Sequence, residues 1–285
     1  MAITRTNSQA LVDEASIADL LVEPLLDASK ISQIATVMPN IGGSAVRVPI
    51  IADDDDHVQF AAEAAELDIA NPSITEKVFQ WKKIASLVSI SSETVEDAHK
   101  AGGGPLNIVG RSLARSLANR IDRTSFGNAA PANGWSGLQA AHGDMQNAGD
   151  TDLTNVDAVQ DAIALIRAAG GNPSHIVTSP DVYSTLAKAK TGTGSNVPLL
   201  GQSASTDVQT LAVAGLPVIV SPHVVAGTIY VTSPEAMVLA IRRDAKLETD
   251  TSAMFTKDSI AIRITMRAAF GVVNPAHIAK VDIAP

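Results

Sequence analysis

The chain of 285 residues is acidic, with 30 Asp and Glu against 21 Lys and Arg and a net charge of −9. It has no basic stripe, which disfavours a protein that draws its affinity from DNA phosphates, and it has no cysteine, which excludes disulfide bonds and thiolate metal sites. Hydrophobic residues make up 46% and aromatic residues only 3%, so we expect an aliphatic core and no ring-lined cofactor pocket.

The N-terminal segment mixes apolar and charged residues. Asp13, Glu14 and Asp19 interrupt the apolar run that a secretory signal needs, and no window reaches the ~18 apolar residues of a membrane span. Residues 17–26 predict an amphipathic helix or an extended stretch interrupted at Pro24. We expect an apolar arm that packs on a partner.

Two strands separated by an acidic stretch follow. Residues 44–51 alternate in hydropathy, with Pro49 restricting the strand to a sheet edge, and residues 73–91 alternate as one long strand. The run Asp53 to Asp56 lies between them. Because such a strand pair is too thin to bury its own faces, we expect a projecting β-arm.

Helical periodicity dominates the middle of the chain. A short helix over 93–99 ends at glycines 102–104, and Pro105 begins the longest predicted helix, which runs to Gly127. A turn-rich stretch precedes a helix that begins at Thr154 and ends near Gly170. The remaining predicted elements are a strand at 175–179, a helix at 180–190, and strands at 217–221, 228–232, 237–242, 245–251 and 260–266.

No catalytic or ligand-binding motif is intact. The glycines before Pro105 lack phosphate-loop spacing and place Arg111 where lysine is required, and the aspartate run lacks the glycine and glutamate of a calcium loop. Around Ser136 the glycines do not have the spacing of a nucleophile elbow. The six histidines form no pair at metal-ligand spacing. We therefore predict no enzyme activity, no cofactor and no bound metal.

Two pairs of arginines could contact an acidic partner, Arg111 with Arg115 and the adjacent pair Arg242–Arg243. The alternative is a solvated face, or an ion pair with an acid such as Asp122 or Asp244. In an assembly we expect these charges to meet another subunit.

Several stretches along the chain carry a family likeness through their order and spacing. They are DLLVEPLLD at 19–27, KKIASLVSISSETVED at 82–97, IDRTSFG at 121–127, GWSGL at 134–138, IVTSP at 176–180, GLPVIVS at 215–221 and RAAFGVVNP at 267–275. With the order of the predicted elements, they make nearly the whole chain similar to the major capsid proteins of tailed bacteriophages. That fold was first known from phage Hong Kong 97 and is shared with encapsulin nanocompartments.

The resemblance implies an α+β fold of the Hong Kong 97 type. It divides the chain into an N-terminal arm at 1–45, an extended E-loop hairpin at 46–86, a peripheral domain at 87–127 and 237–285, and an axial α/β domain at 128–236. The long helix at about 105–127 is then the spine of the peripheral domain. In the family, axial domains cluster around five-fold and six-fold axes while E-loops and arms lie across neighbours. The implied function is a shell of hexamers and pentamers around a double-stranded DNA genome.

The resemblance also directs expectations about contacts. We expect inter-subunit contacts at Leu20, Leu21, Leu25, Leu26, Ile31, Phe60, Phe79, Trp81, Arg111, Arg115, Arg242 and Arg243. Some relatives join subunits by an isopeptide bond between an E-loop lysine and an asparagine, helped by a glutamate. Here Asp258 and Thr265 stand in those two places, so no cross-link is expected. Because the arm begins almost at Met1, we expect a separate scaffolding protein or an already processed chain, with a portal and a decoration protein as further partners.

Two alternatives stay open at this stage. An encapsulin shell around a cargo enzyme has the same fold, but residues 1–45 look more like the phage arm than like the interior helix with which encapsulins begin. An α/β hydrolase or nucleotide enzyme would require one of the motifs rejected above. We expect weak, non-specific contact with packaged DNA, no membrane association, and assembly in the host bacterial cytoplasm into the virion.

Overall fold

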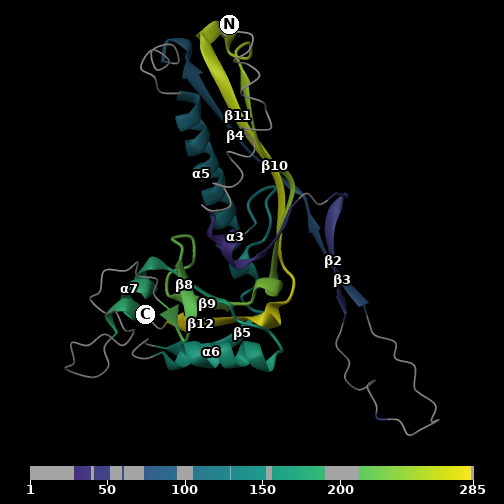
Figure 1. Cartoon of the computed structure of the whole chain (residues 1–285), viewed down its shortest axis with the longest axis vertical. Coiled ribbons are helices and arrows are strands. Elements are labelled where there is room, and N and C mark those ends of the chain that lie inside the picture. Colours follow the sequence, from purple (N-terminus) through teal and green to yellow (C-terminus); the bar gives the residue numbers. More distant parts are fainter. Residues whose placement is uncertain are drawn as a thin grey trace, which may run out of the picture.

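Three sheets organise the described part of the chain. The computed structural model describes residues 29–39, 42–51, 60, 74–94, 105–128, 130–151, 156–189 and 212–283. An upright part holds the long strands and the longest helix, a broader part at one end holds a second sheet with two helices, and a two-stranded hairpin projects to the side (Figure 1). The chain is therefore an α+β protein with an elongated, branched outline.

The upright part is a four-stranded sheet in the order β1-β10-β11-β4. Its strands are β1 (Thr36–Pro39), β10 (Met237–Asp250), β11 (Ser259–Val272) and β4 (Lys82–Ser91), with β1 parallel to β10 and the other pairs antiparallel. Register shifts interrupt the β10–β11 pairing between Ile241 and Lys246. The sheet has two free edges, one of which is the ten-residue strand β4.

Helix α5 (Pro105–Phe126) packs on one face of this sheet. Leu113, Leu117 and Ile121 recur at intervals of four residues, which places them on one side of the helix, and all three are buried. They share a core with alternate residues of β11, including Ile262 and Ile264. The other face of β11 carries Arg263, Thr265 and Arg267 in a row, because successive strand residues point to opposite faces.

The broader part is a six-stranded mixed sheet in the order β5-β12-β9-β6-β8-β7. Its strands are β5 (Gln146–Thr151), β12 (Ile278–Ile283), β9 (Thr228–Thr232), β6 (His175–Thr178), β8 (Leu216–Val220) and β7 (Ala212–Val213). Helices α6 (Asp157–Ala168) and α7 (Pro180–Lys188) bury apolar faces in a core shared with this sheet, among them Val159 and Leu186. Tyr230 of β9 faces the α5 core instead, so the two parts are packed together.

The projecting hairpin consists of β2 (Ala45–Ile51) and β3 (Ile74–Gln80), which pair with each other alone. At its base, Val46 packs with Val238, Ala240 and Ala269 on the outer face of the long-strand sheet. Pro49 lies in this two-stranded sheet, where neither strand is central, so its predicted edge position is confirmed. Toward the other end the strands have no described neighbour (Figure 1).

Short elements connect these parts. They are helix α3 (Lys30–Ile34) and the 3₁₀ turns η3 (Leu138–Ala141), η4 (Pro234–Ala236), η5 (Phe255–Lys257) and η6 (Pro275–His277). No helix among the described residues is long and apolar enough to cross a membrane.

The structure corrects four expectations from the sequence. Residues 29–39 are not part of a detached arm, because α3 packs on α5 and β1 pairs with β10. Residues 73–91 form two strands in different sheets, not one. The expected strands at 237–242 and 245–251 are one strand, β10, bent by irregular pairing. Residues 278–283 join the six-stranded sheet and do not continue the long-strand sheet, as the expected boundary at 237–285 has it.

The predicted helix at 105–127, the helix at 180–190 and the strands at 175–179, 217–221, 228–232 and 260–266 are confirmed to within a few residues. Residue 154, where the next helix was expected to begin, and glycines 102–104 lie outside the described residues. Most of the expected helix at 93–99 lies outside them as well.

Candidate subunit interfaces

The hairpin β2–β3 exposes large apolar side chains along most of its length. Ile74 is 67% exposed and Val78 is 44% exposed, and both belong to β3. A two-stranded hairpin is marginal in water by itself, and only the base of this one is packed on the body. The hairpin is therefore a surface that another chain could cover.

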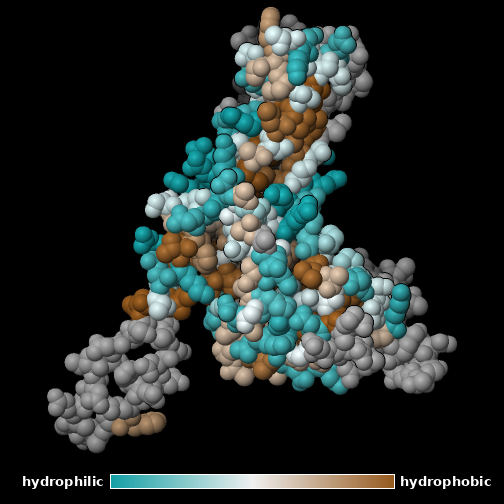
Figure 2. Space-filling model, turned by 180° about the vertical axis from the view of Figure 1, so that it is seen from behind, coloured by the Kyte–Doolittle hydropathy of each residue, from teal (hydrophilic) through white to brown (hydrophobic). Residues whose placement is uncertain are grey.

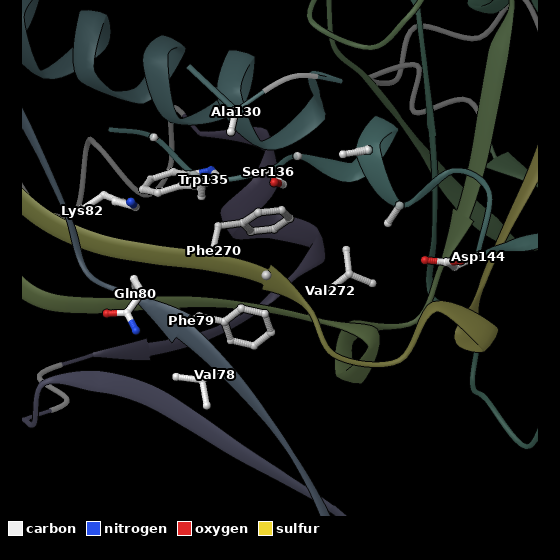
Figure 3. Close-up of a pocket in the computed structure, with 15 residues that line it drawn as sticks. Val78, Phe79, Gln80, Lys82, Ala130, Trp135, Ser136, Asp144, Phe270 and Val272 are labelled. Carbon is white, nitrogen blue, oxygen red and sulfur yellow. The ribbon is translucent and has the colours of Figure 1, made fainter. Parts of the chain in front are cut away.

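The base of the hairpin borders a pocket of about 490 Å³. Phe79 of the hairpin lies on one side, Trp135 lies on the other side beneath α5, and Phe270 of β11 lies between them (Figure 3). Gly271 permits this arrangement, because a Cβ atom there would lie 2.0 Å from the Phe79 ring. The lining has one carboxylate, Asp144, one amine and no histidine, so it offers no nucleophile with a neighbouring base.

A row of cations crosses the outer face of the long-strand sheet. Arg243 of β10 is opposite Arg267 of β11, which is opposite Lys83 of β4, and these three exposed residues are called the cationic row below. They line a hollow of about 150 Å³ together with Lys246 and Arg263. This surface is strongly positive although the chain carries −9.

One carboxylate, that of Glu248, lies in the same hollow. Its Oε2 atom accepts a hydrogen bond of 3.0 Å from Nε of Arg263, and its Oε1 atom lies 3.4 Å from Nζ of Lys246. Arg263, first, and Lys246, second, lower the pKa of the Glu248 carboxyl through these hydrogen bonds. Glu248 thus serves the two cations beside the cationic row.

Residues 10–283 match the model of a protein family described as the phage capsid family. The chain belongs to this family. It is a major capsid protein, a subunit of the phage head shell. A comparison with curated proteins gave no match.

Solved capsid structures share the fold of this capsid protein. The capsid of a native GTA particle superposes with a TM-score of 0.71 at 17% identity, covering 90% of this chain and 91% of that one. A chain of Mycobacterium phage Bobi gives 0.69 at 16% identity with 100% of both chains covered, and one of Microbacterium phage Oxtober96 gives 0.69 at 16% with 90% and 91% covered. The expected Hong Kong 97 type of fold is thus confirmed, and nothing in these comparisons favours the encapsulin alternative.

The residues expected at contacts of the capsid protein fall into three groups. Ile31 is fully buried in the chain's own core, so its expected contact with another subunit is wrong. Phe79 and Trp81 are half-buried at the hairpin base, where they pack on the chain's own sheet. The exposed ones are Phe60, Arg111, Arg115, Arg242 and Arg243, while Leu20, Leu21, Leu25 and Leu26 lie outside the described residues.

The arginines of α5 do not pair with Asp122, the alternative that the sequence left open. Asp122 is 3% exposed and accepts hydrogen bonds from Ser29, Lys30 and Ile31. Arg111 and Arg115 lie on the solvent side of the same helix. Sequence reasoning placed Arg243 at an interface but did not find its partners in the cationic row, Lys83 and Arg267.

The two positions expected to lack the cross-linking residues lie on the long-strand sheet. Asp258 is exposed in the turn before β11, with a φ of 42°, and its carbonyl oxygen accepts a 3.0 Å hydrogen bond from the backbone N–H of Ser92. Thr265 lies on β11 between Lys246 and Ala85, inside the positive hollow. The absence of a cross-link stays a prediction.

The Gly-Trp-Ser-Gly loop at 134–137 has a packing role in the capsid protein. Trp135 is buried, and its Nε1–H donates a 3.2 Å hydrogen bond to Oγ of Ser125 near the end of α5. Gly137 lies so close to the same helix end that a Cβ atom would be 2.4 Å from the carbonyl oxygens of Thr124 and Gly127. The described residues contain no cluster of three or more His, Asp or Glu side chains that could hold a metal ion.

Proposed function

We propose that copies of this major capsid protein tile a closed shell as hexamers and pentamers by covering one another's β2–β3 hairpins, and that the protein performs no catalysis. The single observation that carries the proposal is the hairpin. Ile74 and Val78 are exposed on a strand pair that touches its own body only at the base. Ordering such a hairpin costs conformational entropy that burial on a neighbour offsets.

The exposed apolar surface elsewhere supports the same function. β4, a free sheet edge, exposes Leu87 and Val88, and Phe255 is 86% exposed in the turn before β11. Hydrophobic surface is visible on the upright part of the molecule, which α5 and the long strands build (Figure 2). Apolar surface of this kind on one chain is expected where obligate contacts bury on the order of 2,000 Å² or more per interface.

The remaining parts of the proposal concern partners and place. The shell encloses double-stranded DNA, with which the acidic chain makes only weak, non-specific contact. A separate scaffolding protein, a portal and a decoration protein are its proposed partners. Assembly takes place in the host bacterial cytoplasm, and the finished protein resides in the virion.

Assembly of the purified chain tests this function. Negative-stain microscopy, with and without any co-encoded scaffold, is expected to show capsomers, tubes or round shells. Deleting residues 53–71 between β2 and β3 should leave a folded subunit, checked by circular dichroism, that no longer assembles. A wild-type chain that stays monomeric under all these conditions, or a deletion variant that assembles normally, contradicts the proposal.

A further inference from the structure

The cationic row has no anionic counterpart among the described residues. No ion pair joins a described carboxylate to Arg243, Arg267 or Lys83, and all three side chains are exposed. Like charges directly opposite one another on a sheet are destabilising. The row therefore costs the subunit stability, and an anionic partner would turn that cost into a gain.

The sequence contains one segment of the opposite character. Residues 52–73, which connect β2 to β3, include seven Asp and Glu and no Lys or Arg. Their formal charge of −7 is most of the −9 of the whole chain, since the other residues together sum to −2. The hairpin thus carries the strongest negative charge in the sequence.

The geometry directs that segment away from the row of its own chain. The register pair at the base is Ala45 with Gln80, next to the sheet, and the pair at the far end is Ile51 with Ile74. Seven strand residues span about 23 Å. The hairpin points away from β10, β11 and β4 (Figure 1), so residues 52–73 leave and re-enter the described structure at its outer end.

We propose that the acidic segment 52–73 of one copy docks on the cationic row of a second copy. The inference rests on the proposed shell function and names the partner surface for the hairpin. Electrostatic complementarity of this kind selects the partner and its register more than it adds affinity. It also makes the contact sensitive to salt, because exposed charges are screened.

A cysteine pair tests the contact directly, since the chain has no cysteine of its own. Asp55→Cys is made in one batch, and Ala85→Cys is made in another. Ala85 is exposed on β4, two residues from Lys83 on the same face, and its replacement leaves every cation in place. Mixed assemblies treated with a mild oxidant are expected to give a reducible dimer that neither batch gives alone.

The matched control replaces Ala226, an exposed residue before β9, with cysteine in the second batch. This pairing is expected to give no dimer. Shells that form normally from the Asp55→Cys and Ala85→Cys mixture without a cross-link overturn the proposal. An equal yield from the Ala226→Cys control does so as well.

Charge reversal separates docking from folding. Lys83→Glu with Arg267→Glu should raise the concentration needed for assembly by about tenfold or more, while the unfolding midpoint of the free subunit stays equal or rises because repulsion is removed. Changing Asp53 to Asp56 into lysines should restore assembly of that variant. The control Arg167→Glu with Lys188→Glu, two exposed cations of the six-stranded part, should leave assembly unchanged.

The outcomes separate the two proposals. A wild-type chain that never assembles refutes the proposed function. Wild-type shells whose assembly is unaffected by reversing Lys83 and Arg267 refute this inference alone. If the same reversal lowers only the binding of a duplex DNA fragment and leaves assembly unchanged, the row contacts nucleic acid and the inference is overturned.

Discussion

The Asp122 carboxylate accepts a 2.8 Å hydrogen bond from the backbone N–H of Lys30, 92 residues earlier in the chain. It also accepts bonds from the backbone N–H of Ile31 at 3.1 Å and from Oγ of Ser29 at 2.6 Å. The first N–H groups of a helix have no partner within the helix, and here α5 supplies the partner for α3. This buried contact ties residues 29–39 to the body of the subunit.

Replacing Asp122 with alanine should therefore destabilise the subunit. The variant leaves two backbone N–H groups and one hydroxyl without their acceptor, and an unsatisfied buried group costs about 1–3 kcal/mol. Chemical denaturation measures the change in unfolding free energy. The control Asp161→Ala, on the exposed side of α6, should change it by less than about 0.5 kcal/mol. Equal effects of the two substitutions would show that the Asp122 contact does not stabilise the fold.

Gly271→Ala should loosen the base of the hairpin. A Cβ atom at this position would lie 2.0 Å from the Phe79 ring, and overpacking of this kind costs about 1–3 kcal/mol. Because Phe79→Ala removes the ring that collides, the double variant should lose less stability than the two single losses combined. Thermal unfolding of the three variants measures this coupling. Additive losses would mean that the ring and the glycine do not compete for the same space.

Tyr230 should make the subunit sensitive to alkaline pH. Burial, first, and the nearby Asp282 carboxylate, second, raise the pKa of the Tyr230 phenol above its ordinary value of 10.0. Below about pH 10 the phenol is neutral in both the folded and the unfolded chain, so its contribution to stability is complete. As the pH rises further, only the unfolded chain loses the proton, and stability falls.

The Tyr230→Phe variant separates this effect from general alkaline unfolding. At neutral pH it should lose about 0.5–1.5 kcal/mol, because the phenol no longer donates to Oε1 of Gln139. Above about pH 10 its unfolding free energy should fall less steeply than that of the wild type. Tyr183→Phe, the other tyrosine, serves as the control. Parallel pH profiles for the wild type and Tyr230→Phe would contradict the assignment.

The sequence predicts those elements whose periodicity is unbroken. The spine helix α5 follows from Leu113, Leu117 and Ile121, and strand β11 from the strict alternation at 260–266. The break between β3 and β4 was missed although a signal existed. Apolar residues occupy odd positions at Phe79 and Trp81 and even positions from Ile84 onward, and such a change of parity marks a change of face.

The interface surfaces were only partly predictable for a physical reason. Lys83 lies 160 residues from Arg243, and only the register of β4, β11 and β10 makes them neighbours across Arg267. Asp122 looks like part of a solvated helix face in sequence, because nothing local indicates that α3 packs above it. The projecting hairpin was predictable, since alternation and an acidic connection indicate two strands without a third.

Hydrogen–deuterium exchange of the β2 and β3 amides, in free subunits and in assembled shells, tests most directly whether neighbouring copies cover the hairpin. The account predicts rapid exchange at residues 46–51 and 74–80 in the free subunit and exchange slower by about tenfold or more after assembly, with the buried amides of β9 unchanged as the internal reference. Equal exchange of the hairpin amides in the two states would contradict it.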